Sequence, residues 1–289
     1  MKIIFTALIL LIYFGQHLVL ADPKNATLTK VSKKTSEFVS NLIPGEGDTE
    51  VSFDLREDSK PDYSILAVRE IMPMENGKLF TQLSLFKTKK DNDNRKVGNI
   101  GFGGRKLFKD NTILAGINSF YDWDMDAEHK RTSLGFEIKS AVLDFTFNRY
   151  LGIENGIDTE KVLDGWEYQL ESQVPYVHWA NLFVNSYKWE GEKRNDTEGM
   201  KYGSELTLTP NMIIEYVYDN KDQKGLDDQW FGKLIFVYPG RSGPTAFDGV
   251  STAAWNKDKD MSEELLTKVK RQNKIFVEFS GGATVSRSD

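Results

Sequence analysis

Residues 165–174 read Gly-Trp-Glu-Tyr-Gln-Leu-Glu-Ser-Gln-Val. Because successive side chains of an extended chain point to opposite faces, Trp166, Tyr168 and Leu170 share one face of this segment. The carboxylate and amide side chains between them share the other face. This period of two predicts a β-strand with one apolar and one polar face.

The same alternation recurs along the chain in about twelve segments, an even number that returns the chain to its starting side. Most have roughly the eight to eleven residues that a tilted strand needs to cross a bilayer. We therefore expect an all-β fold, a transmembrane antiparallel barrel of about twelve strands. The predicted strands are Glu50–Leu55, Tyr63–Ile71, Leu79–Phe86, Val97–Leu107, Thr112–Trp123, Lys130–Lys139, Ala141–Tyr150, Gly165–Val174, Ala180–Trp189, Met200–Leu208, Met212–Tyr218 and Trp230–Tyr238.

The connections between these strands fall into two kinds. Those after odd-numbered strands, such as Lys87–Lys96 and Leu151–Asp164, are long and rich in charged residues. Those after even-numbered strands, such as Lys109–Asn111 and Thr209–Asn211, are short, with Met72–Lys78 as the exception. Short periplasmic turns and long outer loops are typical of outer-membrane barrels, whereas a soluble β-sandwich has no reason to separate them.

Aromatic side chains gather at the predicted strand ends. Tyr121 and Trp123 precede a long loop, and Tyr176 and Trp179 flank a short turn. Amphipathic rings prefer the membrane interface, although aromatic residues are also enriched in strands generally. The placement favours a membrane barrel over the remaining alternative, a soluble secreted β-protein.

Composition excludes several classes of protein. Hydrophobic residues make up 39% of the chain, mean hydropathy is −0.46, and no second apolar run is long enough for a membrane-spanning helix. Cysteine is absent, which excludes disulfides and cysteine-based sites. The formal net charge of −6 gives no indication of nucleic-acid binding.

The ends of the chain suggest its processing. Residues 1–21 carry Lys2, a long apolar stretch and small residues before position 22, the pattern of a signal peptide cleaved near Ala21; an uncleaved anchor helix is the alternative. We expect residues 22–48 to form a periplasmic segment with a helix over Thr29–Leu42. The barrel then covers residues 49–239, and a linker, a helix and a tail cover 240–289.

Three adjacent predicted strands carry ordered motifs. They are Asn-Ile-Gly-Phe-Gly-Gly-Arg at 99–105, Gly-Ile-Asn-Ser-Phe-Tyr-Asp at 116–122, and His-Lys-Arg at 129–131 followed by Leu-Gly-Phe-Glu at 134–137. Together they resemble the β-domain of the inverse autotransporters, the intimin and invasin family, and the similarity extends over most of residues 49–279. The motif residues are Gly103, Arg105, Gly116, Asn118, Phe120, Asp122, His129, Arg131, Gly135 and Glu137.

The resemblance implies a twelve-stranded barrel in the bacterial outer membrane, inserted by the general barrel-insertion machinery, through which a C-terminal passenger reaches the cell surface. In intimins and invasins the passenger consists of adhesive domains. Here about fifty residues follow the last predicted strand, whereas an immunoglobulin-like domain needs roughly one hundred. We expect a barrel-only form, with a stand-alone pore or a structural protein as alternatives. Expected partners are outer-membrane lipids, the insertion machinery, and a passenger segment or a cell-surface ligand of the outer loops.

Strand parity places a set of polar side chains in the lumen. Acids and bases there can pair across the barrel and hold its shape, or form a charge ring that selects solutes or guides an exported chain. The inward glycines, 101, 103, 116 and 135, leave room for a threaded segment or permit curvature. The predicted lumenal set is Arg105, Asn118, Asp122, Arg131, Glu137, Asn148, Glu167, Gln169, Glu171, Glu205 and Lys233.

An enzyme is the competing class. After the signal peptide only His129 and His178 remain, and the predicted topology puts them at opposite ends of the barrel. Such a pair shares neither a catalytic triad nor a metal. We expect no catalytic residues, no metal site and no cofactor.

The tail contains a predicted helix over Met261–Arg271. Asp260-Met261-Ser262-Glu263 is similar to a capping box, and acids precede bases along the segment, as the helix dipole favours. We expect this helix to remain in the lumen as a plug, with its cations meeting carboxylates such as Glu137, Glu167 and Glu171; a solvated tail is the alternative. The candidate plug residues are Met261, Leu265, Lys268, Val269, Lys270 and Arg271.

Overall fold

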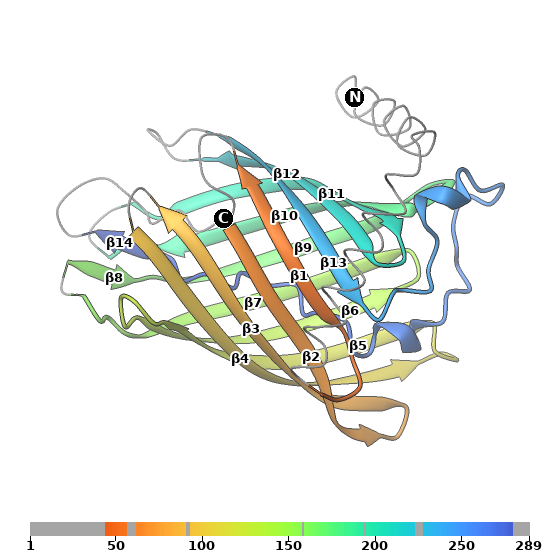
Figure 1. Ribbon diagram of the computed structural model, residues 1–289, viewed down its shortest axis with the longest axis horizontal. Coiled ribbons are helices and arrows are strands. Elements are labelled where there is room, and N and C mark those ends of the chain that lie inside the picture. The colour runs from red at the N-terminus through yellow and green to blue at the C-terminus, as the bar shows by residue number, and fades with distance from the viewer. Residues whose placement is uncertain are drawn as a thin grey trace.

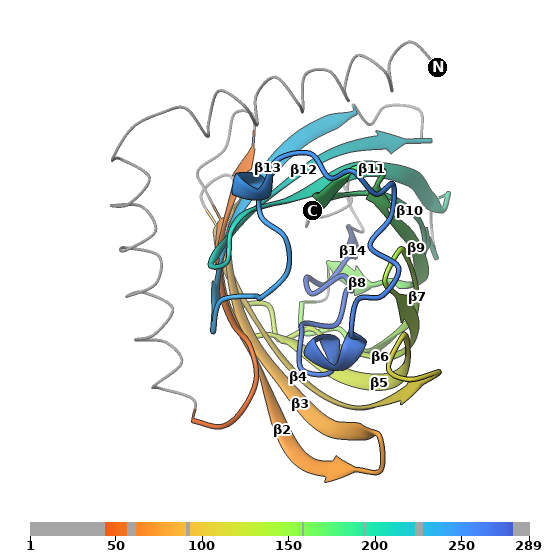
Figure 2. The same cartoon turned by 90° about the vertical axis from the view of Figure 1, so that its right-hand side faces the viewer.

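A ring of tilted strands closes on itself around a segment of its own chain (Figures 1 and 2). This computed structural model describes residues 44–56, 62–90, 93–157, 159–192, 195–222 and 228–279. The predicted signal peptide and the predicted helix Thr29–Leu42 lie outside the described residues.

Twelve strands form the closed barrel, in the order β1-β13-β12-β11-β10-β9-β7-β6-β5-β4-β3-β2. Each of the twelve predicted strands is confirmed. Their bounds are β1 Thr49–Arg56, β2 Asp62–Met74, β3 Gly77–Lys90, β4 Asp93–Phe108, β5 Ile113–Asp124, β6 Lys130–Ser140, β7 Leu143–Glu154, β9 Asp164–Val174, β10 Val177–Glu190, β11 Thr197–Thr209, β12 Met212–Lys221 and β13 Gln229–Tyr238.

The ring is closed by antiparallel pairing of β1 with β13. The register runs from Thr49 opposite Tyr238 to Arg56 opposite Phe231, and β1 pairs with β2 on its other side. Closure leaves no strand edge free in the ring. A separate two-stranded sheet joins β8 (Glu160–Val162), in the connection between β7 and β9, to β14 (Val277–Phe279) near the end of the chain.

The two faces of the ring differ in the way that alternation predicts. Ile117 and Leu134 point outward, with 68% and 63% of their surface exposed. Arg105 and Arg131 point inward and are fully buried. An apolar outer belt around a polar interior is the arrangement that a lipid bilayer requires of a barrel.

One end of the barrel carries tight turns, and we call it the turn end. Turns of two to four residues join β2 to β3, β4 to β5, β6 to β7, β9 to β10 and β11 to β12. Asn76, the three residues 109–111 and Tyr176 take positive φ in these turns. The predicted exception Met72–Lys78 is wrong, because β2 and β3 continue into it and leave only Glu75 and Asn76 as the turn.

The opposite end carries the other connections, and we call it the loop end. The predicted long loop Lys87–Lys96 is mostly strand, because β3 ends at Lys90 and β4 begins at Asp93. Its charged residues hide the alternation on which the prediction relied. The ring strands begin with β1 and finish with β13 at the turn end, so the chain leaves the ring there.

After β13 the chain crosses the turn end before it enters the barrel (Figure 2). This stretch includes the short 3₁₀ helices η1 (Ala246–Asp248) and η2 (Met261–Glu264). Trp179 donates a hydrogen bond to the Gly249 carbonyl oxygen at 2.8 Å, which attaches the crossing chain to β10. None of the described helices is long and apolar enough to cross a membrane.

Candidate functional site

Residues 265–276, which we call the lumenal segment, run inside the ring from the turn end to the loop end (Figures 1 and 2). Just before the segment, the Met261 amide donates to the Asn111 carbonyl oxygen, in the turn between β4 and β5, at 2.8 Å. Just after it, Val277 pairs with Val162 of β8 at the loop end. The segment therefore spans the whole barrel.

Arg105 of β4 binds the wall and the segment at once. Its guanidinium makes two hydrogen bonds to the Glu137 carboxylate of β6, Nε–Oε1 at 2.7 Å and Nη2–Oε2 at 3.2 Å. The remaining amino group donates to the carbonyl oxygens of Glu264, Leu265 and Thr267 at 3.0, 3.1 and 2.6 Å. A buried ion pair with these extra bonds holds the first part of the segment in place.

Asp122 of β5 is the centre of a second cluster, nearer the loop end. It accepts from Arg131 Nε at 2.9 Å, from Asn99 Nδ2 at 2.7 Å, and from Arg271 of the lumenal segment at 2.9 and 2.7 Å. The two guanidinium groups also lie over aromatic rings, Arg131 at 4.4 Å from the centroid of Tyr150 and Arg271 at 4.2 Å from that of Phe120. One carboxylate thus joins a wall arginine to a segment arginine.

Glu167 of β9 forms a third cluster with the segment backbone. Its carboxylate accepts from the Gln272 amide at 2.7 Å and from the Tyr150 hydroxyl at 2.5 Å. Asn148 of β7 donates to Glu167 at 3.3 Å and to the Lys270 carbonyl oxygen at 3.0 Å. The wall therefore satisfies backbone groups of the segment that water would otherwise bind.

Two lysines of the segment bind carboxylates on other strands. Lys270 contacts Glu171 of β9 at 2.5 Å and Glu205 of β11 at 3.9 Å. Lys268 contacts Glu50 of β1 at 2.9 Å. Cations of the segment thus lie opposite anions of the wall on both sides of the lumen.

Apolar side chains of the segment, and Met261 just before it, pack between these polar clusters. Met261 and Leu265 pack in one buried group with Leu107 and Leu114, and Val269 packs in another with Phe80 and Phe120. Near the loop end, Phe276 stacks on Trp189 with ring centroids 4.2 Å apart. Burial of these side chains adds hydrophobic stabilisation to the ion pairs.

The predicted helix over Met261–Arg271 is wrong in length. Only Met261–Glu264 is helical, as a 3₁₀ turn, with the Asp260 side chain accepting from the Ser262 amide. The wall takes the backbone groups that a longer helix needs internally: Arg105 donates to four carbonyl oxygens, and Gln82 Oε1 accepts from the Val269 amide at 2.8 Å. Because these groups are committed to the wall, the segment stays extended.

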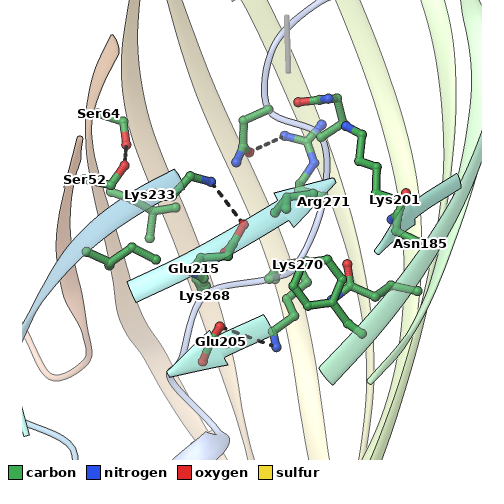
Figure 3. A pocket seen from close by; sticks show the side chains of 18 of the residues that line it. Ser52, Ser64, Asn185, Lys201, Glu205, Glu215, Lys233, Lys268, Lys270 and Arg271 are labelled. Atoms are coloured by element: carbon green, nitrogen blue, oxygen red, sulfur yellow. Dashed lines mark hydrogen bonds and ion pairs between the residues drawn. The ribbon is translucent and has the colours of Figure 1, made fainter. Parts of the chain in front are cut away.

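The segment does not fill the lumen completely. A cavity of about 160 Å³ remains between it and strands β9–β13 and β1–β3 (Figure 3). Gln169, which donates to Glu171 at 3.0 Å, lines this cavity, as does Lys233 of β13, which lies 3.7 Å from Glu215 of β12. These two predicted lumenal residues thus face the cavity, and each contacts a carboxylate of the wall.

The inward glycines make room for wall side chains. A Cβ at Gly103 would lie 2.4 Å from Phe80, and one at Gly116 would lie 2.8 Å from Glu137 Oε1. At Gly135 it would lie 2.4 Å from the Asn118 amide, which is buried beside it. The motif glycines therefore admit the Asn118, Glu137 and Phe80 side chains to the lumen.

The two histidines lie at opposite ends of the barrel. His129 is fully buried at the loop end, where Nε2 lies 2.7 Å from Glu160 of β8 and Nδ1 accepts from the Gly156 amide at 3.0 Å. Although burial opposes ionisation of Glu160, hydrogen bonds from Arg95 and His129 lower its pKa overall. His178 binds the Ala253 carbonyl oxygen at the turn end. In the part of the chain that the structure describes, no three acidic or histidine side chains form a metal cluster.

Several contacts of the segment involve residues that sequence analysis did not single out. Glu50 binds Lys268 and Arg241, Asn99 donates to the Asn273 carbonyl oxygen at 2.9 Å, and Asp62 binds Lys274 at 2.9 Å. The parity rule that selected Arg105 also assigns Glu50 and Asn99 to the lumen. The partners on the segment follow no such rule, since an extended chain in the lumen has no periodic face.

Comparison with known proteins agrees with this geometry. A protein of Escherichia coli named for homology to attaching and effacing proteins is 26% identical over 204 residues, 65% of this chain and 67% of that protein. The inverse autotransporter adhesin YeeJ of Escherichia coli is 24% identical over 216 residues, 69% of this chain but 9% of the adhesin. This chain thus spans a small part of the length of that adhesin.

A solved structure from work on in-meso crystallisation of membrane proteins has the same fold, with a TM-score of 0.60 and 16% identity over 80% of this chain and 99% of that one. The inverse autotransporter β-domain family matches residues 19–273, which include the ring and most of the lumenal segment. The closed ring, the apolar outer belt and this match identify the chain as an outer-membrane β-barrel that belongs to the inverse autotransporter β-domain family.

Proposed function

We propose that this barrel is the membrane anchor and translocator of an inverse autotransporter, with its own lumenal segment holding the pore closed. The passage of residues 265–276 from one end of the ring to the other is the observation that carries the proposal. A chain in that position occupies the route that an exported passenger would take. Its C-terminal side leads out at the loop end, through β14.

The orientation follows from the connections. Outer-membrane barrels keep short turns in the periplasm and longer loops outside, which supports an orientation with the turn end in the periplasm. In the proposed route the chain is first exported and loses residues 1–21 by cleavage near Ala21. The outer-membrane machinery then inserts the barrel. An epitope inserted between β10 and β11 should then be accessible on intact cells, and one at Glu75 should not.

Closure of the pore follows from the charges. The cations of the segment are paired with carboxylates of several strands, so the segment and the wall neutralise one another. Withdrawal of the segment would break these ion pairs and the hydrogen bonds that the wall makes to the segment backbone, so it costs free energy. The closed state is therefore the stable one.

Conductance in planar bilayers tests the proposal. We compare the full chain, a truncation after Gly240, which removes the segment, and a truncation after Phe279, which keeps it. The full chain and the Phe279 truncation should conduct little, and the Gly240 truncation markedly more. Equal conductance of all three would mean that the segment does not close the pore.

A further inference from the structure

An apolar groove marks the outer wall of the barrel near the loop end. It has a volume of about 530 Å³ and is formed by β2–β5, with Ile65, Leu85, Ile100, Tyr121 and Trp123 among its lining residues. The two cavities in the lumen measure about 160 and 290 Å³ and carry charged side chains in their walls. The groove on the outer wall is apolar and faces the bilayer.

Gly98 forms the floor of the groove. It lies on the outward face of β4, between Leu85 of β3 and Trp123 of β5, and its missing side chain leaves space that only the Met125 methyl group approaches. Trp123 and Tyr121 are 43% and 40% exposed and form the wall on the β5 side. A slot of this size between an aromatic and an aliphatic wall suits a single acyl chain.

Two lysines lie directly above the groove. Lys87 and Lys96 occupy opposite positions of β3 and β4, two residues and thus about 7 Å nearer the loop end than Leu85 and Gly98. Like charges directly opposite one another in a sheet repel, so this pair favours an anion between them. Lys87 lies 5.5 Å from the ring centroid of Tyr63, and Lys96 lies 3.6 Å from an Asp126 oxygen while remaining half exposed.

We propose that the groove and the lysine pair form a binding site for one acidic lipid, with an acyl chain over Gly98 and a phosphate-bearing headgroup at Lys87 and Lys96. Continuity with the lipid-facing belt brings acyl chains to the groove, and the lysine pair selects the anionic headgroup. Only the choice of membrane leaflet rests on the proposed orientation. With the loop end outside the cell, the bound lipid belongs to the outer leaflet.

Native mass spectrometry of the full chain in detergent micelles tests the site. The probes are diphosphorylated lipid A, its dephosphorylated form, and phosphatidylcholine. The wild-type protein should retain one lipid A per barrel. Gly98→Leu should reduce the bound fraction of both lipid A forms at least tenfold, because the leucine side chain would fill the groove. The variant should still fold, since a Cβ at Gly98 needs only the Met125 methyl group, 2.7 Å away, to move.

Gly104→Leu is the matched control. Gly104 faces outward on the same strand nearer the turn end, where a Cβ would lie 3.0 Å from Leu79 Cδ2, and this variant should bind as the wild type does. The double variant Lys87→Gln with Lys96→Gln should lose the preference for lipid A over its dephosphorylated form. It also keeps the test decisive if Gly98→Leu fails to fold.

Equal retention of lipid A and phosphatidylcholine by the wild type would overturn the proposal. Equal loss in the Gly98 and Gly104 variants would do the same, since it would indicate ordinary lipid around the barrel. Micelles have no inner and outer side, and the site lies outside the lumen. The result is therefore independent of the membrane orientation and of pore closure.

Discussion

Arg271 of the lumenal segment and Asp122 of β5 meet through two parallel hydrogen bonds, Nη1–Oδ1 at 2.9 Å and Nη2–Oδ2 at 2.7 Å, with both side chains fully shielded from solvent. Arg131 binds the same carboxylate from β6. Two cations therefore share one anion, and the consequences of removing the acid and of removing a base differ.

We expect Asp122→Asn to be more damaging than Arg271→Gln. Loss of the acid leaves two buried guanidinium groups without their shared anion, at a cost of about 3–5 kcal/mol. Loss of Arg271 leaves Asp122 paired with Arg131 and removes charged hydrogen bonds at a cost of about 1.5–3 kcal/mol. Urea unfolding in lipid vesicles measures both. The reverse order would contradict the assignment of Asp122 as the shared partner.

Substitutions on the two faces of β9 should differ. Leu170 is 46% exposed toward lipid, and an arginine there should cost about 2–4 kcal/mol near the membrane midplane. Gln169 lines the lumenal cavity beside Glu171, so Gln169→Arg should cost much less. The measurement is the fraction of protein that migrates as the compact, heat-modifiable form before boiling. Equal losses would refute the assignment of the faces.

The absence of cysteine allows a direct test of where the segment ends. Val162 and Val277 are opposite one another in the sheet of β8 and β14, and opposite positions of antiparallel strands are close enough for a disulfide. We expect the Val162→Cys, Val277→Cys double variant to crosslink on oxidation and to retain low conductance even when combined with Asp122→Asn. Reduction should then raise the conductance, because Asp122→Asn has removed the carboxylate that binds Arg271. Failure to crosslink in the folded protein would place the segment elsewhere.

Asp48, immediately before β1, should make stability depend on pH. Burial raises the pKa of Asp48 to about 7, with Arg241 acting in the opposite direction. Since the unfolded value is about 3.9, ionising Asp48 opposes folding, and its contribution to stability falls as pH rises from about 4 to about 7.

We therefore expect Asp48→Asn to be more stable than the wild type at pH 8, with the advantage disappearing near pH 4. Urea unfolding at both pH values checks this. Asp110→Asn, at an exposed turn position, is the control. The same difference at both pH values would show that ionisation of Asp48 is not its cause.

The sequence predicted the ring well because the bilayer imposes a simple rule. Every spanning strand must alternate between lipid and lumen, and strands such as β9 show that rule without interruption. The ends were less well predicted. The sequence of residues 87–96 is mostly charged and polar and shows no alternation, so the loop-end parts of β3 and β4 could not be distinguished from loop.

The lumenal segment shows a different limit of sequence reasoning. Its location inside the barrel and its cations were expected, but its conformation depends on partners such as Arg105 and Gln82, which lie far away in the chain. Local capping signals at Asp260 predicted a helix, and one 3₁₀ turn formed. Tertiary hydrogen bonds overrode the local preference beyond Glu264.

The order of contacts along the segment has a mechanical consequence. A force pulling outward at Phe279 first loads the three residue pairs of β14 and β8, then the Phe276 stack on Trp189, and only afterwards Arg271 and Arg105. The attachments break one after another, each at its own tension. Such a tether yields in steps and dissipates work at each, which, in the proposed orientation, suits a chain end that is pulled from outside the cell.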